Sequence, residues 1–82
     1  MKKILLKDVN DNDGVFINLD NNKSLNLKNE IHISYDDLLI NHKELLDKSK
    51  RYYIYCKGGI KSKKAVNILE FYGYDVFLVY RQ

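Results

Sequence analysis

Short apolar runs without polar alternation constrain the fold of this chain more than any other feature. Residues 15–19, 52–55 and 76–79 are nearly continuous in aliphatic or aromatic side chains. A strand with one face in solvent alternates apolar and polar residues, whereas a strand covered on both faces need not. We therefore expect these runs to form the inner strands of a sheet that is covered on both sides. Residues 4–6 and 31–33 are weaker strand candidates.

Two helices are predicted between the strands. The first begins at Ser34, because Asp37 three residues later resembles a capping box, and its apolar residues recur at helical spacing as far as Leu46. The second begins near Ser62 and ends at Gly73, where a left-handed cap residue belongs. Its apolar face consists of Ala65, Ile68, Leu69 and Tyr72. This order of elements predicts an α/β domain with a mainly parallel central sheet flanked by helices.

Length and charge narrow the classes of function. The 82 residues fit one small domain, residues 1–82. Lysine outnumbers arginine by 12 to 2, which disfavours a nucleic-acid partner because base readers use the arginine fork. No apolar stretch is long enough for a membrane span or a signal peptide, so we expect no membrane association and a cytoplasmic protein. His32 and His42 lack companion ligands, so neither a metal site nor a cofactor is predicted.

The segment from Cys56 to Ser62 is the candidate functional site. It joins the predicted strand 52–55 to the second helix, and ligands of open α/β sheets bind at such carboxyl ends of strands. Gly58 and Gly59 allow positive φ values, so the backbone can curl and direct several amide N–H groups inward. These amides and the helix amino terminus favour a thiolate over a thiol. The alternative is an inert, buried cysteine at the end of a strand.

Four lysines lie within this segment or directly after it, at positions 57, 61, 63 and 64. Lys61, Lys63 and Lys64 fall at the amino end of the second helix, where positive charge opposes the helix dipole. A sequence selected only for helix stability would carry Asp or Glu there. The lysines therefore indicate a pocket that attracts an anion, with a solvated charged surface as the alternative.

Residues 56–62, Cys-Lys-Gly-Gly-Ile-Lys-Ser, resemble the active-site loop C-x-x-G-x-R-S of the rhodanese family, with Lys61 in place of arginine. Residues 16–20 are similar to the family's "LIDVR" strand, with Asn18 for Asp and Asp20 for Arg, and residues 27–34 line up with "IPGAINIP". Gly73, Tyr74 and Val76 match its "GY-x-V" strand entry. The resemblance covers about residues 15–80. The family normally continues past this point with two glycines and another helix, so the resemblance implies either a domain shortened at its C-terminus or a fragment of a longer chain.

The resemblance implies a small rhodanese-like sulfurtransferase. Cys56 would be the nucleophile that carries sulfane sulfur as a persulfide, from thiosulfate or another persulfide to a thiol or cyanide acceptor, with a sulfur-relay protein as a further partner. The substrate-binding residues would be Lys57, Gly58, Gly59, Ile60, Lys61 and Ser62. Phosphatases of this fold carry one more residue before the arginine, so the smaller loop here favours sulfur over phosphate.

Two other functions remain open on the sequence. The chain could be a sulfur carrier or regulatory docking module that receives a persulfide from a partner, or a structural remnant with an inert thiol. Turnover with thiosulfate would separate the enzyme from both. Persulfide uptake without turnover would separate the carrier from the remnant.

Overall fold

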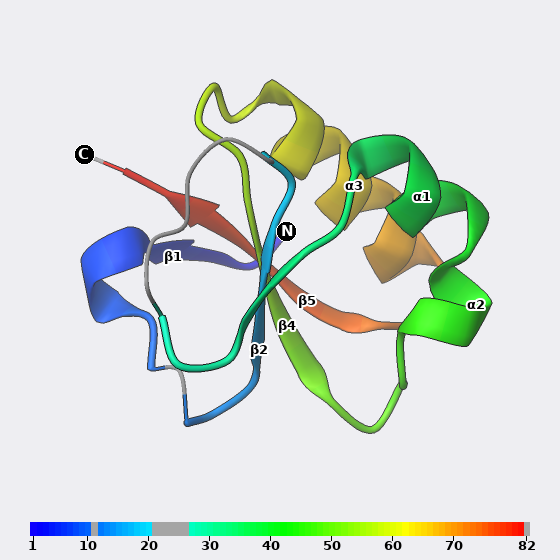
Figure 1. Ribbon diagram of the computed structural model, residues 1–82, viewed down its shortest axis with the longest axis horizontal. Helices are drawn as coiled ribbons and strands as arrows, with labels where there is room; N and C mark the ends of the chain where they lie inside the picture. The colour runs from blue at the N-terminus through cyan, green and yellow to red at the C-terminus, as the bar shows by residue number, and fades with distance from the viewer. Residues whose placement is uncertain (11, 21–26, 82) are drawn as a thin grey trace.

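A single parallel sheet forms the centre of the protein. The computed structural model describes residues 1–10, 12–20 and 27–81, and within them five strands pair in the order β1-β5-β4-β2-β3 (Figure 1). Their bounds are β1 Lys3–Leu5, β2 Val15–Asn18, β3 Glu30–His32, β4 Arg51–Tyr55 and β5 Asp75–Tyr80. Every recorded pairing is parallel, so the prediction of a mainly parallel α/β sheet is confirmed.

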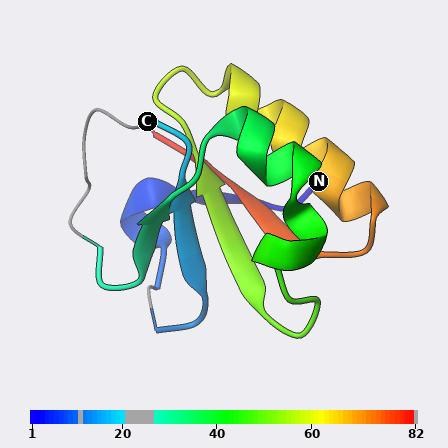
Figure 2. The same cartoon turned by 45° about the vertical axis from the view of Figure 1, so that its right-hand side comes forward.

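Apolar side chains leave both faces of this sheet, as the uninterrupted runs predict. In β4, Ile54 belongs to the cluster beneath the helices, whereas Tyr53 and Tyr55 belong to a cluster on the opposite face. Figure 2 shows the helices on one side of the sheet, and the short 3-10 helix η1, Leu6–Asp8, packs Leu6 against the other cluster. Both faces are therefore covered, which explains why polar alternation is missing from the strands.

The first predicted helix is present but is divided in two. Helix α1 covers Tyr35–Ile40, and helix α2 covers His42–Leu45. Ser34 caps α1 by accepting the Asp37 N–H at 3.1 Å, as predicted. Asn41 interrupts the expected continuous helix, with φ −112° and ψ 23°, and its side-chain amide donates to the Asp37 carboxylate. Asparagine offers the backbone such local alternatives to a helix, and periodicity alone does not reveal them.

The second predicted helix, α3, covers Ile60–Phe71 and begins two residues earlier than expected. Gly59, rather than Ser62, is its N-cap residue. At the other end Gly73 has φ 95° and donates its N–H to the Glu70 carbonyl, while Tyr74 N–H reaches the Leu69 carbonyl. These two bonds form a Schellman motif, so the prediction of a left-handed glycine cap is confirmed.

A fully parallel sheet has two chemically different edges. We call the edge where the strands end the carboxyl edge and the edge where they begin the amino edge. Cys56 directly follows β4, which lies between β5 and β2, so it occupies the middle of the carboxyl edge. Among the described residues, no helix is both long enough and apolar enough to span a bilayer.

Candidate functional site

Cys56 is held where the central strand gives way to a tight loop. Its side chain is only 5% exposed. The backbone N–H groups of Gly59 and Ser62 both donate to the Cys56 Sγ, at 3.1 and 3.3 Å. The loop therefore directs two backbone donors at one sulfur atom.

Gly59 gives the loop its shape. It has φ 80°, which side chains with a Cβ rarely adopt, and a Cβ built there would meet nothing within 4 Å. The glycine is therefore required by the backbone conformation and not by lack of space. The expectation that Gly58 also has a positive φ is not met, because only Gly59 and Gly73 have one among the described glycines. One left-handed residue is enough to turn the chain into α3.

The buried Ser62 adds a hydroxyl to the amide ring. Its Oγ lies 3.3 Å from the Cys56 Sγ and 3.3 Å from the Gly59 carbonyl oxygen. With a thiol, the S–H donates to the Ser62 Oγ while the hydroxyl donates to the Gly59 carbonyl. With a thiolate, the hydroxyl can rotate and donate to sulfur, because its proton has no fixed position. Ser62 can therefore support both protonation states of Cys56.

The four lysines of the loop and helix start all point into solvent. Lys57, Lys61, Lys63 and Lys64 are exposed, and the structure records no ion pair between any of them and a described carboxylate. Among the described residues, no carboxylate therefore neutralises the positive charge of these lysines. Ile60, between these lysines, is an exposed apolar residue at the first position of α3.

One backbone amide of the loop faces away from the sulfur. The Lys57 N–H donates to the carboxylate of Asp20, which follows the neighbouring strand β2. This role of Asp20 does not follow from its place in the family motif, where an arginine is usual. The available signal is positional: residues that follow adjacent parallel strands meet at one edge. The altered second-strand motif therefore still supports the loop, through a carboxylate.

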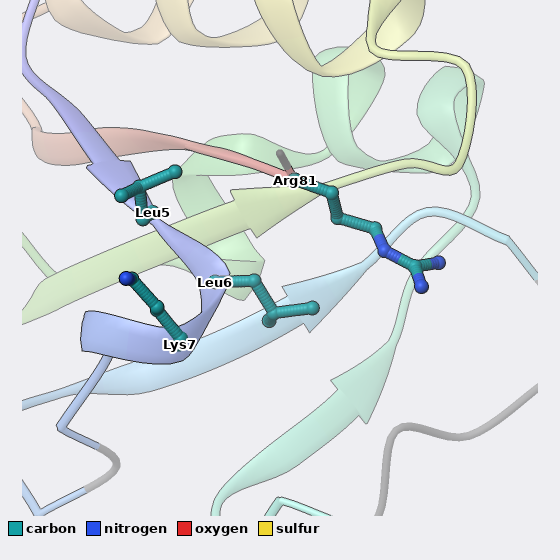
Figure 3. Close-up of a pocket in the computed structure, with 4 residues that line it drawn as sticks. All are labelled: Leu5, Leu6, Lys7 and Arg81. Atoms are coloured by element: carbon teal, nitrogen blue, oxygen red, sulfur yellow. The ribbon is translucent and has the colours of Figure 1, made fainter.

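The remaining candidate sites lie outside the loop. Within residues 1–10, 12–20 and 27–81, no group of three or more His, Cys, Asp or Glu side chains could hold a metal. A shallow pocket of about 300 Å³ lies beside η1, lined among the described residues by Leu5, Leu6, Lys7 and Arg81 (Figure 3). Arg81 also donates to the Tyr55 hydroxyl at 3.4 Å, but no predicted site residue lines that pocket.

Comparison with solved structures identifies the architecture. A rhodanese-related protein from Thermoplasma volcanium superposes with a TM-score of 0.83 at 24% identity, over 96% of this chain and 83% of that one. The domain has a rhodanese fold. A protein from Staphylococcus saprophyticus matches with a TM-score of 0.79 at 20% identity, over 96% of this chain and 86% of that one. The resemblance seen in the sequence is thus confirmed at the level of the fold.

A longer enzyme contains the same architecture. An NAD-dependent persulfide reductase from A. fulgidus matches 95% of this chain with 14% of its own length, at a TM-score of 0.76 and 20% identity. A search with protein-family models found no match, and a search of curated protein sequences found none either.

The rhodanese-like domain brings together only part of the predicted site. Cys56, Gly59 and Ser62 form a compact group around the sulfur. The side chains of Lys57, Ile60 and Lys61 are exposed to solvent. Gly58 is exposed and forms part of the turn. The group thus provides two amide donors and one hydroxyl beside a single sulfur atom, in a loop that carries exposed lysines.

Proposed function

We propose that residues 1–82 act as one rhodanese-like domain and transfer sulfane sulfur as a persulfide on Cys56. One observation carries the proposal: the amide N–H groups of Gly59 and Ser62 converge on the sulfur of the only cysteine. A structural thiol at a strand end needs no such donors, whereas a sulfur that gains and passes on negative charge does.

The first step is nucleophilic substitution at sulfur. The Cys56 thiolate attacks the outer sulfur of thiosulfate, a new S–S bond forms, and the original S–S bond breaks. Sulfite leaves with the bonding electron pair, so the three negative charges of the reactants become one on the persulfide and two on sulfite. No proton or external electron is consumed.

The loop residues have distinct parts in this step. The Gly59 and Ser62 amides hold the sulfur that attacks, and the Ser62 hydroxyl can turn to donate to it. Lys61 is exposed at the second position of α3 and takes the place of the family's arginine as a point charge that attracts the donor. The amino end of α3 adds its dipole to the same field.

The second step returns the cysteine to its starting state. A thiolate or cyanide attacks the terminal sulfur of the persulfide, the Cys56 S–S bond breaks, and Cys56 leaves as a thiolate. We propose a cytoplasmic thiol as the acceptor class. Cyanide is the convenient acceptor for assay.

Mass spectrometry of the intact protein after exposure to thiosulfate tests the proposal. We expect a mass increase of one sulfur atom that dithiothreitol reverses, and no increase in Cys56→Ser. Turnover to thiocyanate with cyanide completes the test. A wild-type protein that gains sulfur neither from thiosulfate nor from an organic persulfide, at concentrations that load an active rhodanese run in parallel, would refute the proposal.

A sulfur carrier that is loaded by a partner protein is the second candidate function. Its supporting observation is the exposed side chain of Ile60, which is 68% accessible directly beside the cysteine loop. An exposed apolar residue among exposed lysines is better suited to contact a protein surface than to bind a small anion. A similar domain also forms part of a persulfide reductase. Persulfide uptake from a protein donor without thiocyanate production would favour this function over the enzyme.

A further inference from the structure

Asp20 places a negative charge beside a loop whose other charged residues are lysines. Its carboxylate accepts the Lys57 N–H, 37 residues away in sequence, and so binds the first amide after Cys56. A nest of backbone amides ordinarily offers such an N–H to a bound anion. Here that donor is already occupied by an internal carboxylate. The amides that remain directed at the sulfur belong to Gly59 and Ser62.

The position of Asp20 is fixed from several sides. Its own N–H donates to the Asn18 Oδ1 at 2.9 Å, and its carbonyl oxygen lies 3.0 Å from the Nδ1 of His32. Asn18 is in turn held by a 3.0 Å bond from its Nδ2 to Glu30, and its side chain is fully buried. These contacts hold the Asp20 backbone through both its N–H and its carbonyl group. The carboxylate therefore has a defined position next to the loop.

We infer that Asp20 is the positioning residue of the Cys56 loop and that its charge makes the site discriminate against dianionic sulfur donors. This charge shifts the donor preference of the site towards organic persulfides with at most one negative charge. This inference rests on the proposed function, and it narrows the substrate class of the same site. In the transfer, Cys56 thiolate attacks the terminal sulfur of the donor, the donor's S–S bond breaks, and the organic thiolate leaves with the electron pair.

Two substitutions separate the tether from the charge. Asp20→Asn keeps an oxygen that can accept the Lys57 N–H but removes the charge. Asp20→Ala removes both. Asp13→Asn is the matched control, because it removes the same charge in an exposed residue before β2, at the amino edge. Thermal melts of all three variants check that they fold.

The first measurement is the rate of Cys56 persulfidation, by quenched mass spectrometry, against the concentration of two donors. These are thiosulfate and the persulfide of 2-mercaptoethanol. In Asp20→Asn we expect the half-saturating concentration of thiosulfate to fall about threefold to tenfold. The half-saturating concentration of the persulfide should fall by about the square root of that factor, because it carries one negative charge instead of two. The maximal rates should not change. Asp20→Ala should lower the maximal rate for both donors, because the loop loses its tether. Asp13→Asn should match the wild type.

The second measurement does not depend on sulfur transfer. Cys56 is alkylated with anionic iodoacetate and with neutral iodoacetamide, and the ratio of the two rates is compared among the variants. We expect Asp20→Asn to raise the ratio about twofold to threefold over that of Asp13→Asn.

The outcomes distinguish the two proposals. A ratio and a thiosulfate half-saturation in Asp20→Asn that match those of Asp13→Asn would overturn the role of the charge. A full maximal rate in Asp20→Ala would overturn the tether. A wild-type protein that gains sulfur from neither donor refutes the proposed function, while the alkylation ratio still decides whether Asp20 repels anions from the loop.

Discussion

The charged side chains at the two edges of the sheet differ in their ion-pair partners. At the amino edge, the Asp75 carboxylate contacts both Lys2 and Arg51, and each of these cations also lies over the Phe77 ring, at 4.6 and 5.1 Å. At the carboxyl edge, the four exposed lysines that follow Cys56 in the loop and in α3 have no recorded ion pair among the described residues. The ion pairs of Asp75 contribute to the stability of the amino edge, whereas the structure records no corresponding pairing for the lysines of the carboxyl edge among the described residues.

The two ends of α3 allow the same comparison within a single element. Each end carries a glycine with a positive φ, Gly59 at 80° and Gly73 at 95°, and neither would meet a close contact on gaining a Cβ. Gly73 completes a helix cap, whereas Gly59 directs its own N–H at the Cys56 sulfur. Similar backbone conformations therefore have a structural role at one edge and a proposed chemical role at the other.

Replacing Cys56 with serine should give the largest effect. We expect Cys56→Ser to lose persulfide formation and thiosulfate:cyanide activity completely, because the chain contains no second thiol. Serine keeps an acceptor for the Gly59 and Ser62 amides, so circular dichroism should show a retained fold. The measurements are intact-protein mass and thiocyanate production. Activity in this variant would mean that Cys56 does not carry the sulfur, and that the carboxyl edge is not the site of transfer.

Reversing the charge of Lys61 should give the next largest effect. We expect Lys61→Glu to lower kcat/KM for thiosulfate about tenfold or more, because it reverses the field beside an anionic donor. The same change should leave stability equal or raise it by about 0.3–1 kcal/mol, because an acidic residue suits the first turn of a helix. Lys61→Arg should keep or raise the activity.

Lys50→Glu is the control for Lys61→Glu, since Lys50 is exposed in the turn before β4, at the amino edge. It changes the net charge equally but should leave kcat/KM close to the wild-type value. Melts and kinetics on the same preparations check both variants. Equal activity of Lys61→Glu and Lys50→Glu would mean that Lys61 is only a solvated surface residue.

Alanine at the two positive-φ glycines should separate stability from activity. We expect Gly59→Ala and Gly73→Ala each to destabilise the domain by about 1 kcal/mol, because both force a Cβ into the left-handed region. Only Gly59→Ala should also lower the rate of persulfide formation, since it shifts an amide that contacts the sulfur. Urea denaturation and quenched mass spectrometry give the two quantities. Equal rates in the two variants would contradict the role of the Gly59 amide.

Removing the Asp75 charge should give the smallest effect, confined to stability and its pH dependence. The hydrogen bond from Lys2, followed by that from Arg51, holds the pKa of Asp75 below its usual range, although partial burial opposes this. A lowered folded-state pKa contributes stability above the ordinary aspartate pKa, and that stability is lost as pH falls through the folded value.

We therefore expect Asp75→Asn to cost about 0.2–1 kcal/mol at neutral pH, the range of exposed ion pairs. Its melting temperature should fall less than that of the wild type between about pH 6 and about pH 3. Sulfur transfer should be unchanged. A loss of activity in this variant would show that the two edges are coupled.

Local pattern predicted the strands better than the helix boundaries. The strands around Ile54 and Phe77 could be predicted without knowing which strands they pair with, because a strand buried on both faces has a distinctive composition. The break at Asn41 depends on a side chain that bonds to Asp37 and competes with the helix. The start of α3 at Ile60 depends on Gly59, whose left-handed conformation was expected, although its role as the N-cap was not.

The sequence by itself determined the fold class, the place of Cys56 after a central strand, and the glycine that shapes its loop, since these follow from composition and short-range spacing. Only the tertiary structure decided the order β1-β5-β4-β2-β3, and with it that Asp20 meets Lys57 across 37 residues. Strand order depends on pairing between distant segments, and hydrophobic periodicity specifies which face a residue occupies but not which strand lies beside it. The amides around the sulfur could thus be predicted, whereas the carboxylate at their edge could not.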